Sequence, residues 1–299
     1  MDRSARPLLL SLLVCALGIA PCLAATDDAA PDHQVSPDEQ AFLDALKNLQ
    51  WVKGPTTVDI PGKSRLMVPE GYAFLDQRNT DKYLELTHNI ATGSDVMVAP
   101  DDLHWVAYFS FNEEGYVKDD EKIDAPRLLE TLQQDARDGN EERRRRGWAE
   151  LQVVGWAVPP AYNPENHRLE WATTLESAGE RGVNFSTKVL SRRGHTSVIL
   201  VCAPDDLAGA RPKLESLLAG YSFNTGERYA DWVPGDKVAT YGLAALILGG
   251  AAAIATKKGL WAIIGTFIIA KIKLVIAGLV AAGAAIKKFL SGRKTDDTR

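Results

Sequence analysis

Four strand-like segments follow one another between residues 150 and 202, and they constrain the fold more than any other feature of the chain. They are rich in β-branched and aromatic residues and cover Glu150–Trp156, Arg168–Leu175, Val183–Leu190 and Thr196–Cys202. The residues between them are typical of turns: Pro159-Pro160, Asn163-Pro164, Gly179 and Arg193-Gly194. Because short turns can join neighbouring strands only in antiparallel order, the sequence predicts an antiparallel meander.

Helical patterns surround these strands. Ser36 and Pro37 form a helix start, and Phe42, Leu43, Leu46 and Leu49 follow at helical spacing. Further helices are predicted at residues 80–88, 124–146 and 205–219, and further strands at residues 57–60, 64–68, 104–111 and 221–223. The sequence therefore predicts an α+β domain over residues 36–226, in which helices cover an antiparallel sheet.

The N-terminus has the three parts of a secretory signal peptide. Arg3 and Arg6 precede the apolar run Leu8–Ala20, and small residues stand at Cys22 and Ala24. We expect residues 1–24 to be a signal peptide and residues 25–35 a disordered spacer. The alternative is an uncleaved N-terminal anchor.

Apolar sequence returns near the C-terminus, after a linker expected at residues 227–237. Residues 238–256 carry no charge, and a helix of that length spans about 28 Å, so a transmembrane helix is predicted there. A buried core helix is the alternative. The second apolar segment, residues 257–290, contains Lys271 and Lys273, so it is either a returning span or a set of interfacial helices. A basic, polar tail follows at residues 291–299.

Charge placement predicts an orientation in the membrane. The chain has a net charge of −5, but residues 237–299 contain ten Lys or Arg and only two Asp or Glu. Lysines that flank a span favour the cytoplasmic side, so we expect a protein of the inner membrane, in contact with its lipid, with the soluble domain in the periplasm. The acidic remainder argues against a nucleic-acid partner. Small residues at Ala245, Gly249 and Ala253 could pack two copies together as a homo-oligomer.

No sequence motif for catalysis or metal binding was found. None of the five histidines stands at zinc-ligand spacing, and no nucleophile elbow or phosphate loop is present. Cys202 ends an apolar strand and is expected to be a buried, inert thiol. The acidic stretch Glu113–Asp124 could hold calcium, but it lacks the pattern of an EF-hand loop and reads as an exposed loop. No cofactor and no metal are therefore expected.

Two segments combine charges with aromatic side chains and are the candidate binding segments. They are Gly115–Asp120 and Gly155–Trp171, and we expect them to lie close together and to bind another envelope protein. The candidate residues are Tyr116, Lys118, Asp119, Asp120, Trp156, Tyr162, His167 and Trp171. One alternative is that these aromatic residues belong to the core. Another is an envelope hydrolase that uses His167 or the Asp119/Asp120 pair as general base.

The chain resembles a family of membrane-anchored bacterial envelope proteins that is defined by a domain of unknown function. The matching stretches are Phe42–Pro55, Val68–Leu75, Gly115–Asp120, Asn140–Gly147, Gly155–Trp171 and Tyr229–Leu246. Ser191 departs from the pattern, where the family typically has glycine. A weaker resemblance at the level of the fold is to the Mog1/PsbP-like sandwich. These resemblances imply a membrane-anchored extracytoplasmic binding or assembly module, and they imply no catalytic residue.

Overall fold

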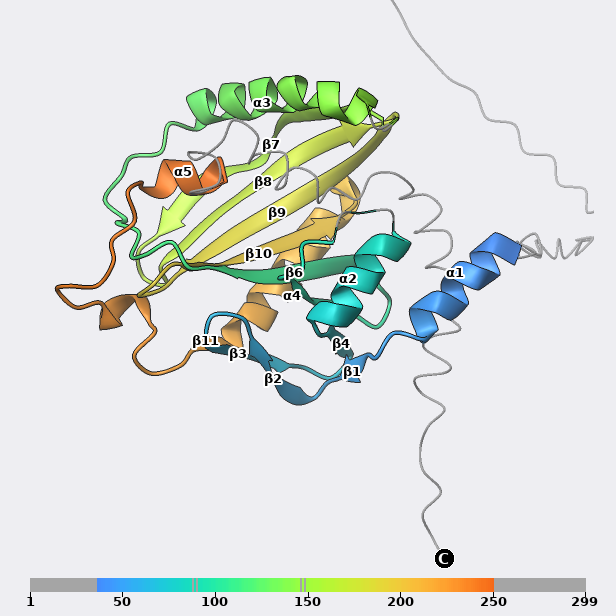
Figure 1. The fold of residues 1–299 in the computed structure, drawn as a ribbon, viewed down its shortest axis with the longest axis horizontal. Coiled ribbons are helices and arrows are strands. Elements are labelled where there is room, and N and C mark those ends of the chain that lie inside the picture. The colour runs from blue at the N-terminus through green and yellow to red at the C-terminus, as the bar shows by residue number, and fades with distance from the viewer. Residues whose placement is uncertain (1–36, 88, 90, 146, 148, 250–299) are drawn as a thin grey trace, which may run out of the picture. The chain divides into compact units, whose positions relative to one another are not determined.

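The computed structural model describes residues 37–87, 89, 91–145, 147 and 149–249 (Figure 1). An eight-stranded sheet has the strand order β1-β4-β5-β6-β10-β9-β8-β7, and a three-stranded sheet has the order β11-β3-β2. Every pairing of named strands is antiparallel. The strands of the large sheet are β1 Val52–Lys53, β4 Tyr72–Leu75, β5 Val96–Pro100, β6 Trp105–Asn112, β7 Leu151–Asn163, β8 Arg168–Ser177, β9 Glu180–Leu190 and β10 His195–Cys202.

The meander predicted from the sequence is confirmed, because β7, β8, β9 and β10 pair in consecutive order. The turn predicted at Pro159-Pro160 is wrong, since both prolines lie inside β7. A proline cannot donate a hydrogen bond to a neighbouring strand, so it is tolerated mainly in edge strands and at bulges. Both conditions hold here, because β7 is the last strand of the sheet and its register with β8 shifts three times between Val153 and Ala161.

The small sheet and one helix cover one face of the large sheet. Strands β2 Thr56–Ile60 and β3 Ser64–Val68 form the predicted hairpin, and β11 Tyr221–Phe223 pairs with β3. Helix α4, Leu207–Ala219, follows the short 3-10 helix η1, Pro204–Asp206. The core between these layers is apolar and includes Phe109, Phe185, Val198, Leu200, Leu66 and Leu214. Burial of this apolar area is the main force that holds the layers together.

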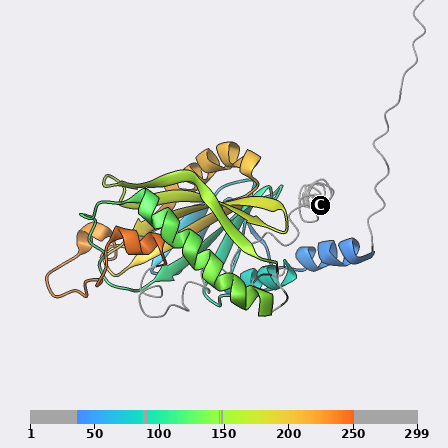
Figure 2. The same ribbon diagram turned by 90° about the horizontal axis from the view of Figure 1, so that it is seen from above.

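Four helices lie on the other face of the large sheet, where they form two separate apolar clusters. Helix α3, Ala125–Arg145, lies over the strands near β7 (Figure 2) and contributes the buried residues Leu128, Leu132 and Ala136. Helix α5, Leu243–Ile247, joins the same cluster. Helices α1, Pro37–Lys47, and α2, Gln77–Leu86, form the second cluster over β4, β5 and β6.

Local signals in the sequence explain where α3 begins and ends. The Asp124 carboxylate accepts a hydrogen bond from the backbone N–H of Arg127, 3.1 Å away, as an N-cap does. Gly147 stands just past the helix with φ +68°, a conformation that favours glycine. The side chain of Asn140 bonds to both backbone groups of Leu151, at 2.8 and 2.9 Å. These two bonds fix α3 against the edge of β7.

Residues 227–249 differ from their predicted roles as a linker and the start of a membrane span. Tyr229, in the 3-10 helix η2, Tyr229–Asp231, is buried, and the Arg192 guanidinium forms two hydrogen bonds with the Asp236 carboxylate, at 2.7 and 2.9 Å. Val238 forms a parallel bridge with Tyr116, and Leu243, Leu246 and Ile247 are core residues. Hydropathy alone cannot distinguish such a core helix from a span, so the open alternative of a buried helix fits this part.

The proposed packing seam is not supported by the described part of the chain. Ala245 lies in α5, but Gly249 lies beyond the end of that helix with φ +109°, so the two do not share one helical face. Ala253 lies outside the described residues. Among the residues described here, no helix is both long and apolar enough to cross a bilayer. The predicted signal peptide, the spacer, residues 250–256, the second apolar segment and the tail also lie outside the described residues.

Candidate functional site

The two candidate segments lie together, as predicted from the sequence. The hydroxyl of Tyr162 donates a hydrogen bond to the Asp119 carboxylate at 2.6 Å. Nδ1 of His167 lies 3.2 Å from the same hydroxyl and 4.0 Å from the Asp119 oxygen. Tyr162 and His167 flank the turn from β7 to β8, whereas Asp119 follows β6, so the site joins parts of the chain that are far apart in sequence.

Backbone contacts hold the Asp119 segment in place. The N–H of Gly115 donates to the carbonyl of Arg193, and Tyr116 exchanges backbone hydrogen bonds with Lys237 and Ala239 at 2.8 and 2.9 Å. Gly115 has φ +100°, and a Cβ there would lie 2.9 Å from the Lys237 carbonyl oxygen. Glycine is therefore required at this position both by its backbone conformation and by the close approach of residue 237.

Four aromatic rings form a continuous stack beside this hydrogen-bonded group. His167 packs on Tyr229 with ring centroids 4.4 Å apart, Tyr229 stacks on Tyr116 at 4.4 Å, and Tyr116 contacts Trp232 at 5.2 Å. The Tyr229 hydroxyl donates to the carbonyl of Val117 at 2.9 Å. The Tyr116 and Tyr229 rings are stacked and the other two pairs are tilted, and aromatic pairs in such arrangements add about 0.5–1.5 kcal/mol each beyond the burial of area. The stack therefore makes the site rigid.

The environment keeps two of the tyrosines protonated. Burial, followed by the hydrogen bond to Asp119, raises the pKa of Tyr162 far above its usual range. Burial, followed by contact with Tyr116, does the same for the pKa of Tyr229. At neutral pH both side chains are therefore neutral phenols that donate hydrogen bonds. Such a site is suited to recognition by shape, hydrogen bonding and the Asp119 charge.

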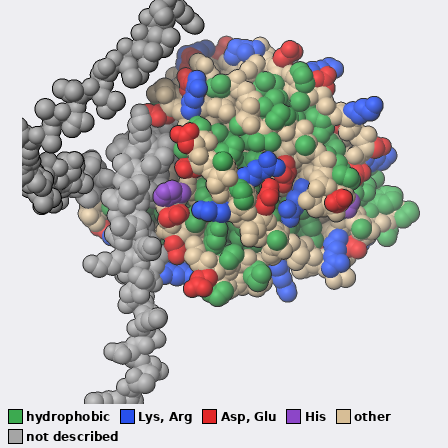
Figure 3. Space-filling model, turned by 180° about the vertical axis from the view of Figure 1, so that it is seen from behind, with side chains coloured by type: hydrophobic (Ala, Val, Ile, Leu, Met, Phe, Trp, Pro, Cys, Tyr) green, Lys and Arg blue, Asp and Glu red, His purple; other side chains and the backbone are tan. Residues whose placement is uncertain are grey.

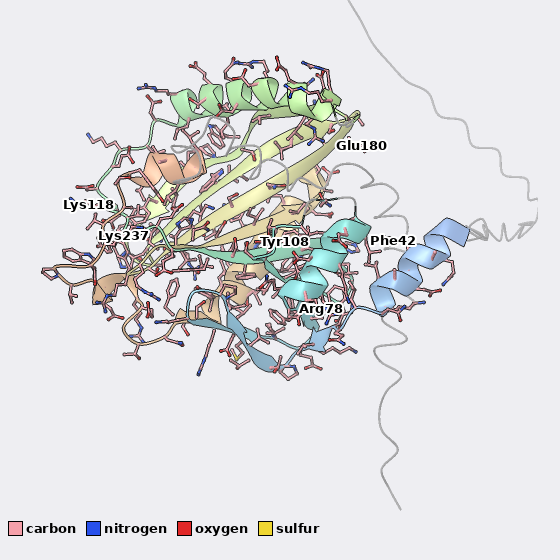
Figure 4. All side chains as sticks on the ribbon, viewed as in Figure 1. Phe42, Arg78, Tyr108, Lys118, Glu180 and Lys237 are labelled. Carbon is pink, nitrogen blue, oxygen red and sulfur yellow. The ribbon has the colours of Figure 1, made fainter. Side chains whose placement is uncertain are left out.

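Other predicted residues have different positions around the site. Lys118 and Asp120 are exposed on the segment beside Lys237 (Figure 4). Trp156 is half-buried and donates its indole N–H to the carbonyl of Ala125 at 3.1 Å. The prediction of Trp171 as a surface residue is wrong: it is 6% exposed and belongs to the core cluster under α3. It stands on β8 opposite Ser186, on the helix-covered face, so the core-packing alternative holds for this residue.

A comparison with protein-family models decides the family. The model described as "Protein of unknown function (DUF2167)" matches residues 52–283, well over half of the chain. The chain belongs to the DUF2167 family. This confirms the resemblance to a family defined by a domain of unknown function. The family match covers most of the strands, the candidate site and the C-terminal apolar sequence as far as residue 283.

Similarity to other known proteins is weak. No curated protein matches this DUF2167 chain. Among solved structures, the cyanobacterial PsbP (CyanoP) of Synechocystis sp. PCC 6803 is similar at 8% identity with a TM-score of 0.35. The likeness covers 58% of this chain and 95% of that one. Similarity at this level says nothing about the function of the DUF2167 domain.

Tyr229 and Trp232 are site residues of the DUF2167 domain that sequence reasoning missed. Both lie in the matching stretch Tyr229–Leu246, but they stand over 110 positions from Tyr116, and only the tertiary structure brings them to it. The described residues contain no group of three or more His, Cys, Asp or Glu that could hold a metal ion. Cys202 is buried, as predicted, and burial raises the pKa of its thiol to about 12.

Proposed function

We propose that this protein is a binding or assembly module of the bacterial envelope. In this proposal it docks a partner protein on the surface around Asp119, Tyr162 and the ring stack. The observation that carries the proposal is the Asp119–Tyr162–His167 hydrogen-bonded group beside four stacked rings. It joins two segments that each combine aromatic and charged residues, and it leaves Lys118 and Asp120 exposed beside them.

The physical logic is that of a protein interface. Tyrosine and tryptophan dominate interface hot spots because they bring a large contact area and lose little conformational freedom. Rings that are already stacked lose still less on binding. Exposed charges such as Lys118 and Asp120 act mainly on the rate and orientation of association. On the face of the molecule seen in Figure 3, basic and acidic side chains are interspersed, so we propose no nucleic-acid partner.

The location is part of the same proposal and is supported by the sequence alone. Residues 1–24 have the pattern of an export signal. Because α5 belongs to the core, the proposed contact with inner-membrane lipid falls to the apolar sequence after Gly249. The domain would then stand on the periplasmic side of the inner membrane.

Site-specific photo-crosslinking in intact cells tests the docking surface. A photoreactive amino acid is placed at Lys118, and the matched control carries it at Met67, which is 58% exposed on β3. We expect one discrete crosslinked product from position 118 and none from position 67. Replacing Tyr162 with Phe in the same chain should reduce that product, because Asp119 loses its hydrogen-bond donor. Equal labelling from both positions would reject the surface.

A hydrolase is the second candidate, because His167 and Asp119 approach within 4.0 Å at a partly exposed site. His167 also has φ +52°, an uncommon conformation for a residue with a side chain, and such strain is enriched at functional sites. In this candidate His167 is the general base. Hydrolysis of model esters by the purified chain, and its loss in His167→Ala, would favour the hydrolase over the binding module.

A further inference from the structure

A band of polar side chains crosses the helix-covered face of the large sheet. Ser110 on β6, Ser197 on β10 and Lys188 on β9 lie directly opposite one another in register. The Lys188 ammonium donates a hydrogen bond to the Ser197 hydroxyl at 2.7 Å. Asp95 lies just before β5, where its carboxylate accepts a hydrogen bond from Thr92 at 2.7 Å. Asp95 is only 7% exposed, so a carboxylate is buried within this band.

The band continues into the rows on both sides of this one, with Tyr108 in the row of Ile199 and His195 in the row of Asn112. His195 is 3% exposed, and its Nδ1 lies 3.7 Å from the Glu114 carboxylate. Tyr108 on β6 is 4% exposed (Figure 4). Within the described part of the chain, neither Nδ1 of His195 nor the hydroxyl of Tyr108 has a hydrogen-bond partner. Buried polar atoms nearly always have one, so these two atoms indicate that the band has a further partner.

The band separates the two apolar clusters of this face. Figure 1 shows α3 along β7 on one side and α2 on the other, with β9 and β10 between them. The cluster under α3 and α5 ends at Leu169, Trp171 and Leu190, and the cluster under α1 and α2 ends at Val106, Tyr108 and Val201. A partner that fits this face is therefore apolar on both sides and positively charged in the middle.

We propose that this face binds residues 260–286 of the same chain and that the ammonium groups of Lys271 and Lys273 lie beside Asp95 and Glu114. The described chain ends on this face, because Gly249 follows α5, which is packed into the cluster under α3. Fifty residues follow Gly249. Residues 260–286 are apolar except for Thr266 and two central charges, Lys271 and Lys273, which is the pattern that the face requires.

Charge supports the same pairing. The band contains two carboxylates, Asp95 and Glu114, and one ammonium group, Lys188. Burial raises the pKa of Asp95, and burial lowers the pKa of Lys188 to about 8. Burial also lowers the pKa of His195 well below its usual value, so the imidazole is neutral. The ammonium groups of Lys271 and Lys273 would face carboxylates here, whereas an anion would be repelled by them.

This inference rests on the proposed contact of the C-terminal sequence with membrane lipid. It adds a condition, namely that residues 260–286 contact lipid only after they leave the sheet face. Two lysines at the centre of a bilayer are costly, while in the band they gain carboxylate partners. The sheet face and the membrane then compete for one segment. In this scheme the domain holds its own apolar segment until lipid takes it up, and uptake uncovers the polar band.

Disulfide crosslinking of the full chain tests this arrangement. The chain is made by cell-free synthesis, with or without vesicles of phosphatidylethanolamine and phosphatidylglycerol, and its three native cysteines are replaced by alanine. Cysteines are placed at Ser186, which lies on β9 in the band, and at Ile272, between the two lysines. The matched control pairs Ile272→Cys with Met67→Cys on β3.

We expect the crosslink to form from position 186 without vesicles, to be absent from position 67, and to be lost when Lys271 and Lys273 are both changed to Glu. Vesicles should reduce it. Equal yields from positions 186 and 67, or a yield unchanged in the Glu variant, would overturn the proposal. Protection of the domain from trypsin in each variant shows that it is folded. Flotation with the vesicles reports lipid contact separately, so failure of the membrane proposal is distinguishable from failure of the docking proposal.

Discussion

Replacing Leu246 with alanine tests whether α5 belongs to the core of the domain or to a membrane helix. Leu246 is 1% exposed and packs in the cluster formed with α3, β7 and β8. The substitution removes three buried carbon atoms, worth about 2 kcal/mol of transfer free energy, and the cavity raises the loss to about 3 kcal/mol. In a helix surrounded by lipid, the same change exchanges one apolar side chain for another and leaves the soluble domain unaffected.

Thermal unfolding of the full chain, followed by tryptophan fluorescence, measures this loss. For a domain of about 200 residues, each kcal/mol lowers Tm by about 2–4 °C, so we expect a fall of roughly 6–12 °C. The control is Val233→Ala, because Val233 is 47% exposed and its truncation should change Tm by about 1–2 °C at most. A Tm for Leu246→Ala equal to that of the control would refute the placement of α5 in the core.

Three further predictions concern single side chains. Tyr162→Phe removes the donor to Asp119, and because both side chains are partly exposed we expect a loss of only about 1 kcal/mol in urea unfolding, with the fold unchanged. The two hydrogen bonds from Arg192 lower the pKa of Asp236 to about 2, so its contribution to stability is complete above about pH 4 and is lost as the pH falls through about 2. In Arg192→Ala the decline of the urea midpoint over that range should be shallower. Cys202, with a thiol pKa of about 12, should resist iodoacetamide at pH 8 in the folded chain and react once urea unfolds it.

The sequence predicted the long regular elements well, because their signals are local. The four strands of the meander, the hairpin at Pro61-Gly62 and the cap and end of α3 follow from turn residues and side-chain periodicity. Strands β1, β4 and β5 were missed. β1 and β4 have only two and four residues, too few to show a period, and β5 is buried at every position, so it shows no alternation. Pro159-Pro160 was misread as a turn. Two prolines can lie within β7 because β7 is an edge strand, and the position of a strand in its sheet cannot be seen in the local sequence.

The candidate site was predicted only in part, because some of its features are local and others depend on the whole sheet. The meeting of Asp119 with Tyr162 and His167 followed from composition, since both segments combine charged and aromatic residues. Trp171 has the same composition but lies on the covered face of β8, and strand orientation cannot be read without knowing which face is buried. The polar band at Asp95 and Lys188 was not foreseen, because its members come from separate strands and share no motif.

The order in which residues 227–249 attach to the domain determines how it responds to mechanical load. Going back along the chain from Gly249, the first attachment is α5, then the bridge of Val238 to Tyr116, then the Arg192–Asp236 pair, and then the rings of Trp232 and Tyr229. A pull on the C-terminal side loads these attachments one after another before it reaches β11. Tension therefore releases α5 first and opens the aromatic site only after the Val238 bridge and the Arg192–Asp236 pair have separated, while both sheets stay intact.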